Sequence, residues 1–235
     1  TIYGSLIYSN DWSGTTGRYG IYSFPAGEYT APTQVVPVES YDANGGGCYV
    51  DGTYYWNSYV YTPEMGYTFS TFCSYDFATG KFDKKTQSFL SDGFDQSQIT
   101  NDMTYDPTTG TIYALSYIAV DIAEGAMQRF YPALSTMDSY SGFVAPIARI
   151  PAMIAIAANQ SGELYGITKG AESALYLINK SSGDLTEIGP TGLNPEYVQS
   201  MAFDPITDKL YWAAVEYTGR SGLYERYRKE ENAMN

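Results

Sequence analysis

The chain has 235 residues, of which 44% are hydrophobic and 17% charged, and this suits one globular domain with its own core. It contains no His, which excludes Ser-His and Cys-His nucleophiles and nearly every His-containing zinc site. Its 13 basic and 26 acidic residues give a net charge of -13, which would repel nucleic acid and anionic membrane surfaces.

Short strand-like segments recur along the chain, each built around one Tyr. With 25 Tyr, 23 Gly and 11 Pro, the composition favours short strands joined by tight turns. In chain order the segments cover 1–4, 52–56, 102–114, 162–166 and 200–212. Their equivalent tyrosines, 46 to 58 residues apart, are Tyr3, Tyr55, Tyr113, Tyr165 and Tyr211. Self-similarity at such a period indicates a repeat architecture.

A second element follows each Tyr segment after a loop of variable length. Its clearest copies are 72–82, 134–144 and 175–185, with shorter relatives at 20–24 and 222–224. In the clear copies a strand ends in Asn or Asp and turns through Ser or Thr to Gly. Asx side chains satisfy turn amides and Gly accepts a positive φ, so this pattern predicts a hairpin.

Each repeat therefore consists of four strands, a to d. Strand a carries a Met-aromatic-Asp-Pro segment, strand b the Tyr, strand c ends at the Asn or Asp turn, and strand d follows the turn. The turns at Asp106 and Asp204 are predicted to be structural, because one carboxylate per turn falls short of a calcium cage. Four residues are expected on strands a, facing neighbouring repeats: Met103, Tyr105, Met201 and Phe203.

A unit of four antiparallel strands cannot bury both faces alone, whereas units arranged radially cover one another. The sequence thus predicts an all-β fold, a β-propeller of four-stranded antiparallel blades. Segments 175–185 and 200–212 resemble blades of the NHL and YWTD types found in bacterial secreted propellers. The resemblance extends over nearly the whole chain, but it implies a blade and no particular chemistry.

The predicted propeller covers 1–224, with repeats around 1–44, 45–98, 99–150, 151–197 and 198–224, followed by a polar tail at 225–235. The strand inventory is b-c-d, three complete sets and a-b-c, which makes 18 strands. About five blades, complete or partial, are thus expected in this chain. Either they form a five-bladed ring, or the chain is part of a six- to eight-bladed one. The start at Thr1 leaves a removed leader or a longer chain equally open.

Candidate binding residues lie in the loops that lead into strands a, which converge at one mouth of a propeller channel. They combine aromatic faces with amide and carboxylate groups, as a neutral sugar requires. The candidates are Tyr41, Asp42, Asn101, Asp102, Tyr197 and Gln199, with Trp12 from a b–c loop as an exposed aromatic. Their other interpretation, as ordinary polar loop residues, stays open.

The two cysteines, Cys48 on a strand a and Cys73 on a strand c, are predicted to be free and buried, since these strands are not neighbours. The sequence predicts no cofactor, no metal and no catalytic residue.

Three functions fit these features. The preferred one is a non-catalytic binding module of an exported bacterial protein, periplasmic, cell-surface or extracellular, that takes a glycan or a partner protein at the channel mouth. The alternatives are a glycosidase or lyase that pairs carboxylates such as Asp42 and Asp102, and a scaffold for other domains.

Overall fold

The computed structural model describes residues 2–6, 20–25, 32–37, 46–62, 67–87, 98–120, 129–196, 199–216 and 221–226. These ranges contain 18 β-strands. Across them no helix is long and apolar enough to cross a membrane.

The strands form five antiparallel sheets, three with four strands and two with three. The first two sheets are β1 (Ile2–Leu6), β2 (Gly20–Phe24) and β3 (Thr33–Pro37), then β4 (Gly47–Val50), β5 (Thr53–Thr62), β6 (Tyr67–Asp76) and β7 (Lys81–Gln87). The third and fourth are β8 (Gln98–Asp106), β9 (Thr111–Val120), β10 (Arg129–Met137) and β11 (Val144–Arg149), then β12 (Met153–Ala158), β13 (Leu164–Thr168), β14 (Ala174–Ile178) and β15 (Leu185–Pro190). The fifth is β16 (Ser200–Phe203), β17 (Leu210–Val215) and β18 (Ser221–Arg226).

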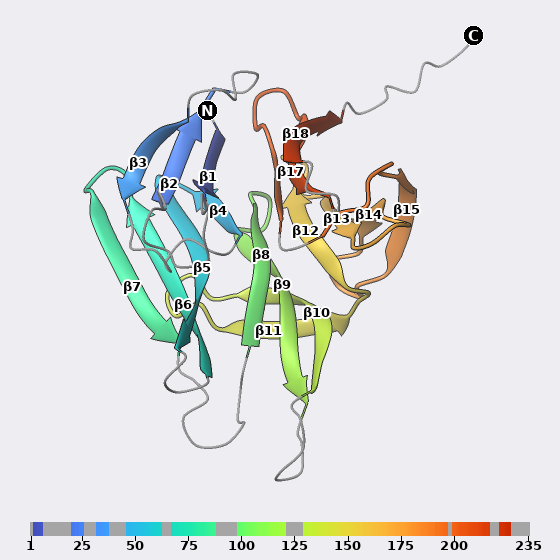
Figure 1. Cartoon of the computed structure of the whole chain (residues 1–235), viewed down its shortest axis with the longest axis horizontal. Coiled ribbons are helices and arrows are strands. Elements are labelled where there is room, and N and C mark those ends of the chain that lie inside the picture. The colour runs from blue at the N-terminus through green and yellow to red at the C-terminus, as the bar shows by residue number, and fades with distance from the viewer. Residues whose placement is uncertain are drawn as a thin grey trace.

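These sheets are the blades of a β-propeller and follow one another in chain order around a common centre (Figure 1). Strands β4, β8, β12 and β16 lie innermost, and β8 packs between β4 and β12 while β12 also packs against β16. The predicted fold and the predicted inventory of three, twelve and three strands are confirmed. The last strand ends at Arg226, two residues beyond the predicted end of the propeller.

The repeat tyrosines occupy equivalent places, as predicted. Tyr3 and Tyr211 lie on β1 and β17, and the other three lie on the second strands of the four-stranded blades. Tyr55, Tyr113 and Tyr165 each pair with the residue two positions before the Asp or Asn that begins the turn after the third strand. The local sequence therefore defines the register of each hairpin.

Successive blades are joined by apolar clusters that contain residues from both. At two interfaces the repeat Tyr contacts an aromatic residue on the next inner strand. The rings of Tyr3 and Tyr49 stack with centroids 5.7 Å apart, and those of Tyr165 and Phe203 lie 5.2 Å apart. Such ring pairs add about 0.5–1.5 kcal/mol beyond their area burial. The abundant tyrosines on second strands are thus largely packing residues between blades.

The inner strands carry the predicted large side chains, but not all to the same depth. Met103 and Met201 are buried between blades, whereas Tyr105 and Phe203 are half-buried.

The turns and cysteines are as predicted. Asp106 accepts a hydrogen bond from the backbone N–H of Thr108 at 2.8 Å, and Asn179 accepts one from that of Ser181 at 3.0 Å. Cys48 and Cys73 are free and buried, on strands β4 and β6, which are not adjacent in their sheet.

Candidate functional site

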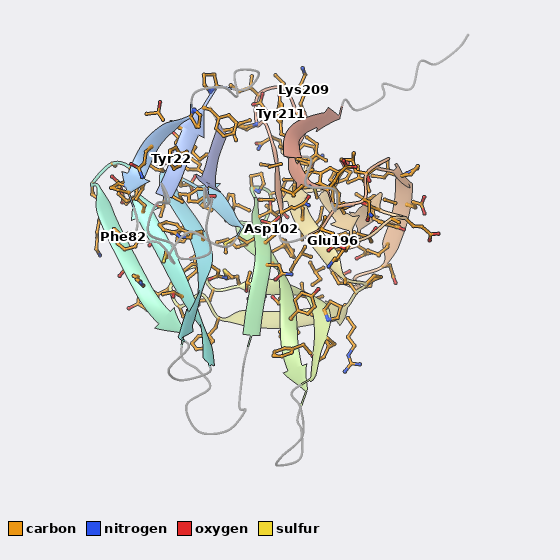
Figure 2. All side chains as sticks on the ribbon, in the orientation of Figure 1. Tyr22, Phe82, Asp102, Glu196, Lys209 and Tyr211 are labelled. Carbon is orange, nitrogen blue, oxygen red and sulfur yellow. The ribbon has the colours of Figure 1, made fainter. Side chains whose placement is uncertain are left out.

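The centre of the propeller holds a buried carboxyl group, that of Asp102 on β8. Counted from the pairing with the repeat Tyr, Asp102 has the same place on its inner strand as Gly46, Ala155 and Ser200 have on theirs. In Figure 2 it lies near the middle of the molecule, far from the outer strand that carries Phe82. Four inner strands therefore present one residue each around this point.

Asp102 connects three blades through hydrogen bonds. Its Oδ2 accepts a bond from the backbone N–H of Ile156 at 2.9 Å, and its Oδ1 accepts one from the hydroxyl of Ser200 at 2.9 Å. The backbone N–H groups of Met103 and Met201 also donate to the carboxyl group. One side chain thereby bonds to Ile156 and Ser200, which are 54 and 98 positions away in the chain.

The second blade leaves room for this carboxyl group by having glycine at the equivalent place. A Cβ on Gly46 would lie 1.9 Å from Oδ1 of Asp102 and 2.7 Å from its Cα, so any other residue would displace β4 or β8. The backbone N–H of Gly46 also donates to the carbonyl oxygen of Asn101 at 3.1 Å. We call Gly46, Asp102, Ile156 and Ser200 the central site.

Burial controls the acid–base behaviour of the central site. It raises the pKa of Asp102 well above the usual range, although the four hydrogen-bond donors oppose this shift. Burial likewise raises the pKa of the Cys48 thiol and of the Tyr54 hydroxyl, and the nearby Asp102 charge adds to both shifts. The raised pKa values of Asp102, Cys48 and Tyr54 all favour the neutral forms of these groups.

Two of the sequence-predicted binding residues, Asn101 and Asp102, lie at the centre. Asn101 is half-buried at a β-bulge in the pairing of β8 with β9, whereas Asp102 has no exposed surface. The prediction that these two residues lie in the loop leading into the inner strand is wrong, because β8 already begins at Gln98. Gln199 immediately precedes Ser200, whose bond to Asp102 brings the start of β16 next to the middle of β8. Trp12, Tyr41, Asp42 and Tyr197 lie outside the described residues, and the predicted ligand site as a whole stays a prediction.

Gln199 supports the connection between the fourth and fifth blades. It is 5% exposed, and its Nε2 donates to the carbonyl oxygens of Glu196 and Val215 at 2.7 and 2.6 Å. Within the described part of the chain its Oε1 has no hydrogen-bond partner. Nearby, Lys169 forms an ion pair of 2.7 Å with Glu196. The Oε1 atom is itself buried, so of these groups only the Lys169–Glu196 ion pair reaches solvent.

A second polar link between blades, at the opposite end of the strands, was not predicted. The Nζ of Lys180, in the turn between β14 and β15, lies 2.6 Å from Oδ2 of the buried Asp106 in the turn between β8 and β9. The same amino group lies 5.9 Å from the centroid of the Tyr113 ring. The next inner strand, β12, has Ala158 at the place where β16 has the aromatic Phe203. In the sequence, this link is indicated only by the Lys of the turn Asn179-Lys180-Ser181, which is otherwise like the other turns.

The ion pair determines how Asp106 responds to acid. Burial would raise its pKa, but the hydrogen bonds from Lys180, Thr108 and Thr109 outweigh burial and lower the pKa to about 2. Its unfolded-state value is about 3.9. The native state thus binds fewer protons, so this contribution to stability is complete above about pH 4 and is lost as the pH falls toward 2.

Replacing Lys180 with Met should make the protein more sensitive to acid. The Lys180 amino group is the contact that lowers the pKa of Asp106 most, so this pKa rises in the variant. The acid-induced fall in the free energy of unfolding therefore moves to higher pH. Urea unfolding between pH 2 and 6 measures the shift. Lys84→Met, at an exposed lysine, is the control. Superimposable pH profiles for Lys180→Met and the wild type would contradict the proposed link.

Metal binding has no support in the described residues, among which no three His, Cys, Asp or Glu side chains are placed to hold an ion. No protein-family model matches the sequence. No curated protein matches it significantly.

Solved structures do resemble the fold. The α-L-arabinofuranosidase of Fusarium graminearum, solved with an iminosugar inhibitor, gives a TM-score of 0.54 at 9% identity, over 89% of this chain and 66% of that one. A puromycin hydrolase gives 0.50 at 13% identity, over 95% and 33%. A gluconolactonase from Xanthomonas campestris gives 0.49 at 12% identity, over 88% and 64%. This chain spans about two thirds of the first and third proteins and one third of the second, and at these identities the likeness shows the propeller fold alone.

Proposed function

We propose that the protein is a non-catalytic binding module that takes a neutral glycan at the loop end of the propeller. By loop end we mean the channel mouth at which the chain enters the inner strands. One observation favours a binding function over a catalytic one. Both carboxylate oxygens of Asp102 are engaged by donors from the protein, and the side chain has no exposed surface. A general acid or nucleophile must reach its substrate, and this carboxyl group bonds instead to neighbouring blades.

The enzyme alternative keeps some support from the fold. The solved structures of similar shape include an arabinofuranosidase and a puromycin hydrolase, so propellers of this kind do host hydrolases. A glycosidase needs two carboxyl groups roughly 5 to 10 Å apart on either side of the scissile bond. The predicted pair of Asp42 and Asp102 meets this need only if Asp102 leaves its three-blade network, which would leave buried donors unpaired.

The ligand class follows from the residues predicted at the loop end. Tyr41, Tyr197 and Trp12 supply faces for sugar C–H groups, and Asn101 supplies an amide for hydroxyl groups. The net charge of -13 disfavours acidic polysaccharides and favours neutral or basic ones. An exported location suits this ligand, because free glycans of this kind occur outside the cytoplasm.

A glycan array tests the proposal with the wild type and a Tyr41→Ala/Asn101→Ala/Tyr197→Ala variant. Each contact contributes about 0.5–1.5 kcal/mol, so losing three should weaken binding at least about tenfold. Tyr140→Ala is the matched control, because Tyr140 is 80% exposed in a turn at the opposite end of the strands. Its binding should equal that of the wild type.

Two outcomes would count against the proposal. Unchanged glycan binding by the triple variant would place the site away from the loop end. An array without hits would remove the glycan and favour a partner protein, or a scaffold for other domains, as the remaining functions.

A further inference from the structure

The fifth blade has three strands, whereas the second, third and fourth blades have four. Its outermost strand is β18, which pairs with β17 from Ser221 to Arg226. Within the described part of the chain, no strand pairs with the other side of β18. The backbone N–H and C=O groups on that side form an open edge, to which a further strand can be added.

The sequence after β18 lacks the turn that leads to a fourth strand in the complete blades. Those turns begin with Asp or Asn and have Gly four positions later, with φ between 69 and 74° and its N–H bonded to the first residue's carbonyl oxygen at 2.7 to 2.8 Å. The glycines are Gly80, Gly142 and Gly183. Because Tyr211 pairs with Glu225, the corresponding places after β18 hold Tyr227 and Glu231. Tyr227 cannot cap the turn and Glu231 disfavours positive φ, so the sequence predicts no hairpin of this kind here.

One exposed isoleucine of the fourth blade marks the surface that a further strand would cover. Ile188 is the extra residue at the β-bulge between β14 and β15, and Ile147 has the same place between β10 and β11. Ile147 is half-buried and packs against the cluster between the third and fourth blades, as does Leu185 of the fourth strand β15. Ile188 is instead 43% exposed. A fourth strand in the fifth blade would therefore cover Ile188 as the fourth blade covers Ile147.

The charge of the chain indicates which kind of strand fits this edge. A net charge of -13 repels a second copy and attracts a basic segment. Glu187, next to Ile188 on β15, is one exposed negative charge near the edge. Side chains alternate between the two faces of a strand, so a segment with alternating apolar and basic residues can cover Ile188 and keep its charges in solvent.

We propose that the open edge of β18 is a docking site for an extended, basic segment of a partner protein, which completes the fifth blade as its fourth strand. Backbone hydrogen bonds to β18 provide affinity, and the contact with Ile188 selects an apolar residue at one position. The site is the outer edge of a blade, so it does not depend on glycan binding at the loop end.

A short synthetic peptide that alternates valine and lysine tests the proposal, with fluorescence anisotropy as the measure of binding. It should bind the full chain. The same peptide with a central proline should not bind, because proline lacks the N–H group that strand pairing requires. The two peptides carry the same charge, so equal binding by both would mean attraction between charges alone and would overturn the proposal.

A variant of Ile188 tests the side-chain contact. Ile188→Ala removes the apolar surface that the peptide covers, so peptide binding should weaken at least about fivefold. Ile206→Ala is the matched control, because Ile206 is 91% exposed in a turn of the fifth blade, and it should keep the wild-type affinity. Wild-type affinity in Ile188→Ala would contradict the proposed contact and overturn the proposal.

Hydrogen exchange locates the bound peptide. The amide groups of β18 should exchange more slowly in the complex, whereas those of β7, the outer strand of the second blade, should not change. Protection of β7 without protection of β18 would overturn the proposal. Sedimentation that shows a dimer of the wild type without peptide, and a monomer of Ile188→Asp, would assign the edge to a second copy and would also overturn it.

Discussion

Replacing Asp102 with Ala is expected to lower the free energy of unfolding by about 3 to 5 kcal/mol. The variant deprives the backbone N–H of Ile156 and the hydroxyl of Ser200 of their acceptor, and each buried donor left unsatisfied costs about 1–3 kcal/mol. Equilibrium unfolding in urea measures the loss. Asp184→Ala, at an exposed turn aspartate, is the matched control and should lose far less.

Asp102→Asn separates the hydrogen bonds from the charge. Burial raises the pKa of Asp102 in the native state above the unfolded value of about 3.9, so the native state binds more protons. The contribution is therefore complete below about pH 4 and is lost as the pH rises toward the native pKa. Because an amide cannot ionise, the variant should lack this decrease. A difference between the two proteins that stays constant with pH would show that Asp102 does not titrate as a buried acid.

The second large effect is expected at Trp56, which joins the first blade to the second. Its side chain has no exposed surface and packs in one cluster with Ile21, Val36 and Cys73. Truncation of a buried Trp costs about 3–5 kcal/mol, so Trp56→Ala should lower the free energy of unfolding by that amount.

Thermal and urea unfolding measure this loss, with Ile206→Ala as control because Ile206 is 91% exposed. The control should change stability by no more than about 0.5 kcal/mol. A loss below about 1 kcal/mol for Trp56→Ala would mean that the first blade does not pack on the second through this ring.

Local features of the fold were predictable because the chain repeats them. The hairpin after Ile178 follows from Asn179 and the glycine four residues on, and its geometry does not depend on distant parts of the chain. The same holds for Tyr113 and Tyr165, whose place on a second strand follows from the turns on either side. Strand number and strand order could therefore be derived before the structure.

Contacts between blades were not predictable in the same way. In the sequence, Asp102 resembles other polar residues before a strand, and its role depends on Ile156 and Ser200. Lys180 likewise reads as a turn residue, and only the radial arrangement brings it to Asp106, 74 positions away. The repeat period predicts the number of blades, but it does not predict how each blade is rotated against the next. That rotation decides which side chains of neighbouring blades meet.

The inner edge of β12 has a consequence for how the protein behaves when it is stressed. Strand β12 has a sheet partner on one side only, and its outward N–H groups at Ile156 and Ala158 bond to Asp102 and to the Thr104 hydroxyl, each at 2.9 Å. A buried N–H group left without an acceptor costs about 1–3 kcal/mol. A change in the third blade that withdraws Asp102 or Thr104 would therefore destabilise the fourth blade as well, so damage to one blade passes to the next along the centre of the ring.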